Sequence, residues 1–157
     1  MELAPEEKLG YLIRGGLRFG NLTLPMDYDD LRHACRLSPD DPVAWNLLSI
    51  ACLEHKEFDE ALTAAKRFVS LCPDQDRAFE ARARAHYHVK DFEACIEDCD
   101  EAIRLEPTNA TCWAMRGEAK VAFGDKAGAI SDLDEAIRLQ PDEPQWKLLW
   151  DNAHGGT

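Results

Sequence analysis

The chain has 157 residues, of which 45% are hydrophobic and 31% charged, a composition typical of a globular protein and not of a disordered one. Its formal net charge of −12 argues against nucleic acid and anionic membranes as partners, because both attract clustered Lys and Arg. The N-terminal residues are acidic, no apolar run approaches the length of a membrane span, and the six cysteines are expected to be reduced thiols, so the sequence predicts a cytoplasmic protein.

A repeat of 34 residues organises the sequence. The octapeptide DEAIRLEP ends at Pro107 and DEAIRLQP ends at Pro141, and seven of their eight residues agree at an offset of 34. The same offset reaches Pro73 and Pro39, and it places an aromatic residue at the fourth position of every frame. Such an offset is typical of stacked helix–turn–helix units. The sequence therefore predicts four frames: 8–41, 42–75, 76–109 and 110–143.

The first frame departs from the others. Residues 21–25, with the sequence NLTLP, replace a tight turn, and Asp27 stands where the later frames carry a small residue. Since proline suits the first turn of a helix, the second helix of this frame is expected to begin near Pro25. We interpret 8–41 as a diverged repeat that caps the N-terminal end of the array.

Each later frame is expected to contain two helices. In frame 76–109 they are predicted over 77–89 and 92–105, the second ending before Pro107 because a residue before proline avoids the helical region. In frame 110–143 Gly124 and Asp125 supply the turn. The apolar stripe of the following helix consists of Ala129, Leu133, Ala136 and Ile137.

A last helix is expected over 144–154. Its apolar stripe consists of Trp146, Leu149, Trp150 and Ala153. An array of repeats needs its final apolar face covered, so this helix is interpreted as a C-terminal cap.

These residues and spacings resemble the tetratricopeptide repeat, above all in the stretch from Arg116 to Pro141. The resemblance implies an all-α fold, a right-handed α-α superhelix of 34-residue helix–turn–helix repeats with a capping helix, forming a single domain over 1–157. It also implies a concave groove, lined by the first helix of each repeat, that binds a peptide or helix of another protein. The family motif specifies the fold and says little about the partner.

Two positions of the repeat switch between charged and apolar residues together from frame to frame. The seventh position holds Arg14, Leu48, Arg82 and Arg116, and the twenty-third holds Asp30, Ala64, Asp98 and Asp132. Arginine accompanies aspartate three times, and leucine accompanies alanine once. The pattern predicts that the two positions touch across the helix pair, with two unrelated solvated charges as the alternative.

Two clusters were weighed as chemical sites. Cys95 and Cys99 lie four residues apart, a spacing open to a metal, but both occupy inward positions and core packing is favoured. His86 and His88 point to nearly opposite sides of a helix, His86 toward the partner helix and His88 toward the groove. The sequence contains no nucleophile elbow, glycine-rich phosphate loop or HExxH motif. We therefore predict no enzyme activity, no metal and no cofactor.

The predicted partner-binding groove is apolar toward its N-terminal side and contains a basic spot at Arg77 and Arg84. This spot is expected to grip a carboxylate or an acidic peptide, unless the two arginines are solvated or paired with Asp76 and Glu80. The site residues predicted from the family geometry are Asn46, Leu47, Ile50, Arg77, Arg84, His88, Met115 and Glu118.

Some family members bind acidic chaperone tails through a carboxylate clamp, but in each of two registers only one position carries a matching residue type, so a clamp is not expected here. The favoured function is a non-catalytic adaptor that binds a peptide or helix of a partner protein. The alternatives are a chaperone for secreted substrates and a homo-oligomeric structural module that uses the helix bearing Trp146 and Trp150.

Overall fold

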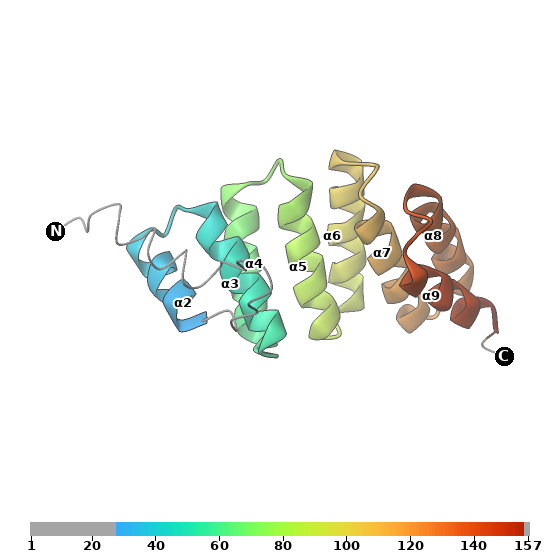
Figure 1. Cartoon of the computed structure of the whole chain (residues 1–157), viewed down its shortest axis with the longest axis horizontal. Helices are drawn as coiled ribbons and strands as arrows, with labels where there is room; N and C mark the ends of the chain where they lie inside the picture. Colours follow the sequence, from blue (N-terminus) through green and yellow to red (C-terminus); the bar gives the residue numbers. More distant parts are fainter. Residues whose placement is uncertain (1–27, 156–157) are drawn as a thin grey trace. The chain divides into compact units, whose positions relative to one another are not determined.

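The computed structural model describes residues 28–155, which form eight α-helices and no strand (Figure 1). These are α2 (Tyr28–Leu37), α3 (Pro42–Glu54), α4 (Phe58–Leu71), α5 (Asp76–His88), α6 (Phe92–Leu105), α7 (Ala110–Phe123), α8 (Lys126–Leu139) and α9 (Pro144–Gly155). Frames 42–75, 76–109 and 110–143 each contain the predicted helix pair, and α9 is the predicted last helix. None of these described helices is both long and apolar enough to cross a membrane.

In the first frame, the structure describes only part of what the sequence predicts. Helix α2 corresponds to its second helix, and Leu31 and Ala34 are fully buried there. The expected turn at 21–25, the start of the helix near Pro25, and Arg14 lie outside the described residues.

The chain divides into two compact units after Cys72. In the first, α3 packs against both α2 and α4. In the second, α7 has the most neighbours, because it contacts α5, α6, α8 and α9. The single domain over 1–157 stays a prediction, and each unit is considered by itself below.

The turn inside each repeat has one backbone geometry. Lys56, Lys90 and Gly124, which are 34 residues apart, all have positive φ, at 64°, 65° and 96°. The next residue closes each turn with an N–H to a carbonyl five residues earlier, as in Asp125 N to Lys120 O at 2.9 Å. Glycine adopts this left-handed conformation without the Cβ clash that lysine experiences. Glycine at position 124 therefore predicts the left-handed turn of its repeat, and Lys56 and Lys90 adopt the same conformation in the other two repeats.

The aromatic and proline positions of the repeat are partners in a hydrogen bond. The indole Nε1 of Trp45 donates to the carbonyl oxygen of Pro39 at 2.8 Å, and that of Trp113 donates to Pro107 at 3.0 Å. In both cases, the tryptophan belongs to the frame that follows the proline. The 34-residue pattern thus includes a bond that ties the start of one repeat to the end of the previous one.

Close approach of the two helices sets the packing within the last repeat. Ala129, Leu133 and Ala136 are fully buried on α8, as the predicted stripe requires. On the facing helix, a Cβ added to Gly117 would lie 3.0 Å from Leu133 Cγ and 3.1 Å from Ala129 O. Those distances are tighter than most Cβ contacts, so a larger residue at this position would require the neighbouring groups of α8 to shift by a few tenths of an ångström.

The predicted arginine–aspartate contact is present in both repeats of the second unit. Arg82 Nη2 lies 2.6 Å from Asp98 Oδ1, and Arg116 Nη2 lies 2.7 Å from Asp132 Oδ1. Each pair joins the two helices of its own repeat, and both aspartates are buried. The alternative of two unrelated solvated charges is therefore wrong for these repeats.

A third basic position completes the pattern. Lys120 Nζ lies 2.8 Å from Asp132, and His86 Nε2 lies 3.8 Å from Asp98. His86 thus faces the second helix of its repeat, as predicted. In the repeat that carries Leu48 and Ala64 instead, both are buried, and Cys52 holds this third position. The polar cluster and the apolar one are alternative ways to fill the same space.

We expect Ala129→Leu to lower the free energy of unfolding by about 1–3 kcal/mol, because the larger side chain must push α7 away from α8. Ala127→Leu is the matched control, since Ala127 lies on the same helix but is exposed. Urea unfolding followed by circular dichroism measures both. Equal effects of the two substitutions would contradict the close packing described for α8.

We expect Arg82→Leu to cost about 3 kcal/mol of stability, because it leaves the buried Asp98 carboxylate with His86 as its nearest basic group. Adding Asp98→Ala should recover part of that loss, since the double variant imitates the Leu48 and Ala64 repeat. Arg104→Leu, which breaks an exposed pair with Glu101, should leave the unfolding midpoint almost unchanged. A double variant less stable than Arg82→Leu would argue against the exchange of polar and apolar clusters.

Candidate functional site

The first helices of the second unit, together with α9, surround a pocket of about 310 Å³. Helix α5 contacts α7, and α7 contacts α9, so the three helices form one face of this unit. The lining residues are Arg84, Tyr87 and His88 from α5, Thr111, Ala114, Met115 and Glu118 from α7, and Trp146 from α9.

Four of the eight predicted site residues lie around this pocket: Arg84, His88, Met115 and Glu118. Arg77 is exposed in the first turn of α5 and is not among the lining residues. The other three, Asn46, Leu47 and Ile50, are half-buried on α3 in the first unit. Partner binding by all eight residues stays a prediction.

Glu118 is the acidic group of the pocket. It is half-buried on α7, and the hydroxyl of Tyr87 donates a hydrogen bond to its carboxylate from α5. Burial raises the pKa of Glu118, and the hydrogen bond from Tyr87 only partly opposes that shift. Within the described residues, Glu118 makes no ion pair. The pocket therefore contains a carboxylate whose negative charge is not balanced by a neighbouring cation.

The basic spot expected at Arg84 is largely neutralised. Arg84 Nη2 lies 2.7 Å from Glu80 Oε1, one turn earlier on α5. The other oxygen of Glu80 accepts a hydrogen bond from Asn109 Nδ2 at 3.1 Å, and Asn109 also donates to Asp76. Arg84 is therefore paired with Glu80, which was the alternative to a free basic spot.

His88 carries little positive charge at neutral pH. Its pKa is lowered, first by burial of the ring and then by the charge of Arg84. The Tyr87 ring contacts both His88 and Phe92 edge-on. The local charge balance of the pocket is consequently negative, with Glu118 as its source.

Four lining residues lie outside the predicted site: Tyr87, Thr111, Ala114 and Trp146. Nothing in the sequence pairs Tyr87 with Glu118, which lies 31 residues further on. The sequence predicts Trp146 only as a packing residue of the C-terminal capping helix. It does pack into the core formed with Ala110, Ala114 and Leu133, and from there it also lines the pocket. Its double role follows from the path of α9 across α7, which has no sequence signal.

The cysteines are packing residues in the described part of the chain. Cys95 and Cys99 are fully buried on α6, in a core that also contains Cys112 from α7. Burial raises the pKa of Cys35 and Cys52 to about 12, so these thiols stay protonated at neutral pH. Among the described residues, no group of histidine, cysteine and acidic side chains is arranged to hold a metal ion.

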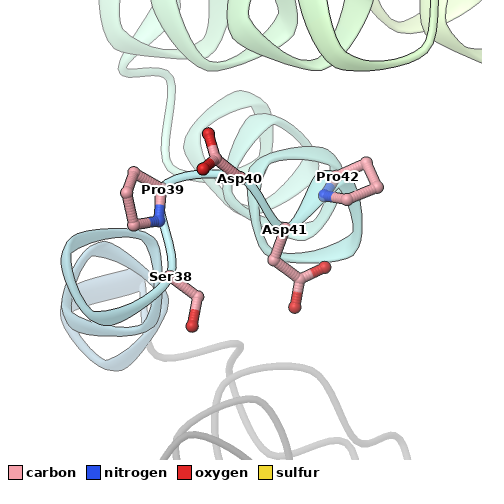
Figure 2. Close-up of a pocket in the computed structure, with 5 residues that line it drawn as sticks. All are labelled: Ser38, Pro39, Asp40, Asp41 and Pro42. Carbon is pink, nitrogen blue, oxygen red and sulfur yellow. The ribbon is translucent and has the colours of Figure 1, made fainter. Parts of the chain in front are cut away.

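A second hollow lies in the first unit, at the turn between α2 and α3 (Figure 2). The polar groups around it form hydrogen bonds and an ion pair that stabilise the turn and the start of α3. The carboxylate of Asp41 accepts from Val43 N at 2.9 Å and caps α3, while Asp40 pairs with Arg67 at 2.8 Å. Arg67 and Trp45 both donate to the Pro39 carbonyl. We therefore interpret this hollow as a structural turn.

Comparison with solved structures shows the fold. The MamA protein superimposes with a TM-score of 0.82 at 17% identity, over 98% of this chain and 84% of that one. The TPR2B domain of yeast Sti1, in a complex with pHsp70, superimposes with a TM-score of 0.71 at 20% identity, over 76% of this chain and 100% of that one. The first TPR of Spaghetti (RPAP3), bound to the HSP90 peptide SRMEEVD, superimposes with a TM-score of 0.70 at 18% identity, over 73% of this chain and 91% of that one. The shared fold class is the all-α repeat superhelix.

Comparison with family models identifies the repeats directly. One model described as tetratricopeptide repeat matches residues 29–76 and 57–110, and a second of the same description matches 110–143. These ranges contain α3 to α8 and all of α2 except Tyr28. A comparison with curated protein sequences gives no match. The two models together cover most of the chain, which therefore belongs to the tetratricopeptide-repeat family.

Proposed function

We propose that this protein is a non-catalytic adaptor that binds a segment of a partner protein on the face formed by α5, α7 and α9. The observation that carries the proposal is the pocket in that face, around which Arg84, His88, Met115 and Glu118 gather. Two proteins of the same fold, Sti1 and Spaghetti, have been solved in complex with pHsp70 and with an HSP90 peptide. Their partners are not assigned to this chain.

The chemistry of the described residues supports binding over catalysis. The acidic group of the pocket, Glu118, is hydrogen-bonded to a phenol, and no cysteine, serine or lysine nucleophile lines the pocket. The six cysteines are free and buried, which supports the expected reducing compartment, the cytoplasm. Asn46, Leu47 and Ile50 remain candidate contacts on α3 of the first unit.

The homo-oligomeric alternative is less well supported, because α9 is already engaged within its own chain. Trp146 is buried, and Trp150 packs on the same core and donates its indole N–H to Asp134 at 2.7 Å. These side chains cover the end of the repeat array, as the capping interpretation requires. No observation specifically favours a chaperone for secreted substrates.

We expect Met115→Trp to weaken partner binding, because the larger uncharged ring fills the pocket whatever the charge of the partner. Ser131→Trp is the matched control, since it adds the same side chain at an exposed position on α8. Affinity purification with the wild-type protein as bait, followed by mass spectrometry, identifies the partner. The purified variants are then titrated with that partner.

An affinity loss of more than about tenfold for Met115→Trp alone is the expected result, since recognition concentrates in a few central residues. Circular dichroism melting of each variant shows whether the fold is intact. If the partner binds both tryptophan variants as tightly as the wild type, it does not use this face and the proposal is wrong.

A further inference from the structure

Glu118 is a half-buried carboxylate on the proposed binding face that makes no ion pair among the described residues. A carboxylate offers about four acceptor positions, and Tyr87 donates to the Glu118 carboxylate from across the pocket. Burying a carboxylate without a compensating charge is costly. A bound partner buries this pocket further, so it must bring a group that balances Glu118, or else the complex is weakened.

The other charged groups around the pocket do not supply that balance. Arg84 is bound to Glu80, and His88 is mostly neutral because burial and Arg84 lower its pKa. An acidic partner would place a second negative charge beside Glu118, and a purely apolar one would leave the carboxylate buried and unbalanced.

The remaining lining suits the stem of a long basic side chain. Ala114 and Met115 provide apolar surface next to Glu118, and the aromatic rings of Tyr87 and Trp146 also line the pocket. Lysine and arginine side chains lay their methylene groups along apolar surface while their charged ends reach a polar partner. Aromatic rings attract such cations as well.

We propose that this pocket receives a lysine or arginine side chain of the partner segment, with the Glu118 carboxylate as its counter-ion and the lining of α5, α7 and α9 around its stem. The inference rests on the proposed function and names the chemistry of the partner at that site. It departs from the acidic partner expected from Arg77 and Arg84. The net charge of −12 on the chain favours approach of a basic segment over long range.

The test uses the full chain and three blocked pentapeptides, acetyl-Ala-Leu-X-Leu-Ala-amide, in which X is arginine, citrulline or glutamate. Citrulline has the shape of arginine without its charge. Binding is followed by the shifts of backbone amide signals in two-dimensional NMR. The arginine peptide is expected to shift the signals of α5 and α7 around the pocket and to bind about tenfold more tightly than the citrulline peptide.

Glu118→Gln keeps the shape of the side chain and removes its charge. This variant should bind the arginine peptide about tenfold more weakly than the wild type does. Its affinities for the arginine and citrulline peptides should then be equal. Glu97→Gln is the matched control, because Glu97 is exposed on α6 outside the pocket, and it should bind the arginine peptide like the wild type.

The affinity for the arginine peptide should also fall as the pH falls from about 8 to about 5. The carboxylate must be ionised to act as a counter-ion, and burial raises the pKa of Glu118, so protonation removes the charge at a higher pH than in an exposed glutamate. Protonation of His88 adds a positive charge and acts in the same direction. Glu118→Gln should lose the part of this pH dependence that comes from the carboxylate.

Three results would each overturn the inference: tighter binding of the glutamate peptide, equal binding of the arginine and citrulline peptides to the wild type, or no shift at the pocket with any peptide. The proposed function is judged separately, by the Met115→Trp titration with the captured partner. A partner that needs Met115 but not Glu118 would leave the adaptor proposal intact and reject a basic side chain in the pocket.

Discussion

The close approach of the two helices within a repeat is the constraint on which the rest of the structure depends. Gly117 faces Leu133 and the backbone of Ala129 at distances where a Cβ would fit only tightly. With so little space between the helices, the inner positions must be small or must fit one another closely. The first helices are thereby held in fixed positions, and the pocket they line with α9 inherits its shape from that packing.

The same constraint explains why polar groups occur between the helices. Asp98 and Asp132 are buried, yet each is bound by an arginine of the opposite helix in a geometry that uses two nitrogens. An ion pair of this kind offsets the cost of burying its charges only when the geometry is good. The exchange with Leu48 and Ala64 shows that an apolar pair fills the equivalent space, so the pairs specify how the helices fit and carry no chemistry.

The candidate site differs from these internal pairs in one physical respect. Buried aspartates on α6 and α8 have arginine partners, whereas Glu118, on the face of α7, has a tyrosine hydroxyl. A neutral donor stabilises a carboxylate less than a cation does. The pocket thus keeps an unbalanced charge at the surface where a partner can reach it, while Arg84, which the sequence suggested as the anchor, is occupied by Glu80.

The sequence by itself determined the repeat length, the helix pairs of 42–143, the capping role of α9 and the contact between positions seven and twenty-three. Each of these depends on periodicity or on neighbours within one repeat, where spacing along the chain fixes spacing in the structure. It also predicted a set of groove residues, and partner binding by them stays a prediction: Asn46, Leu47, Ile50, Arg77, Arg84, His88, Met115 and Glu118. The tertiary structure decided which charges are already paired, that Tyr87 reaches Glu118, and that Trp146 lines the pocket. Those facts depend on side chains from different repeats meeting in space, and a repeat pattern does not encode how far apart two such side chains lie.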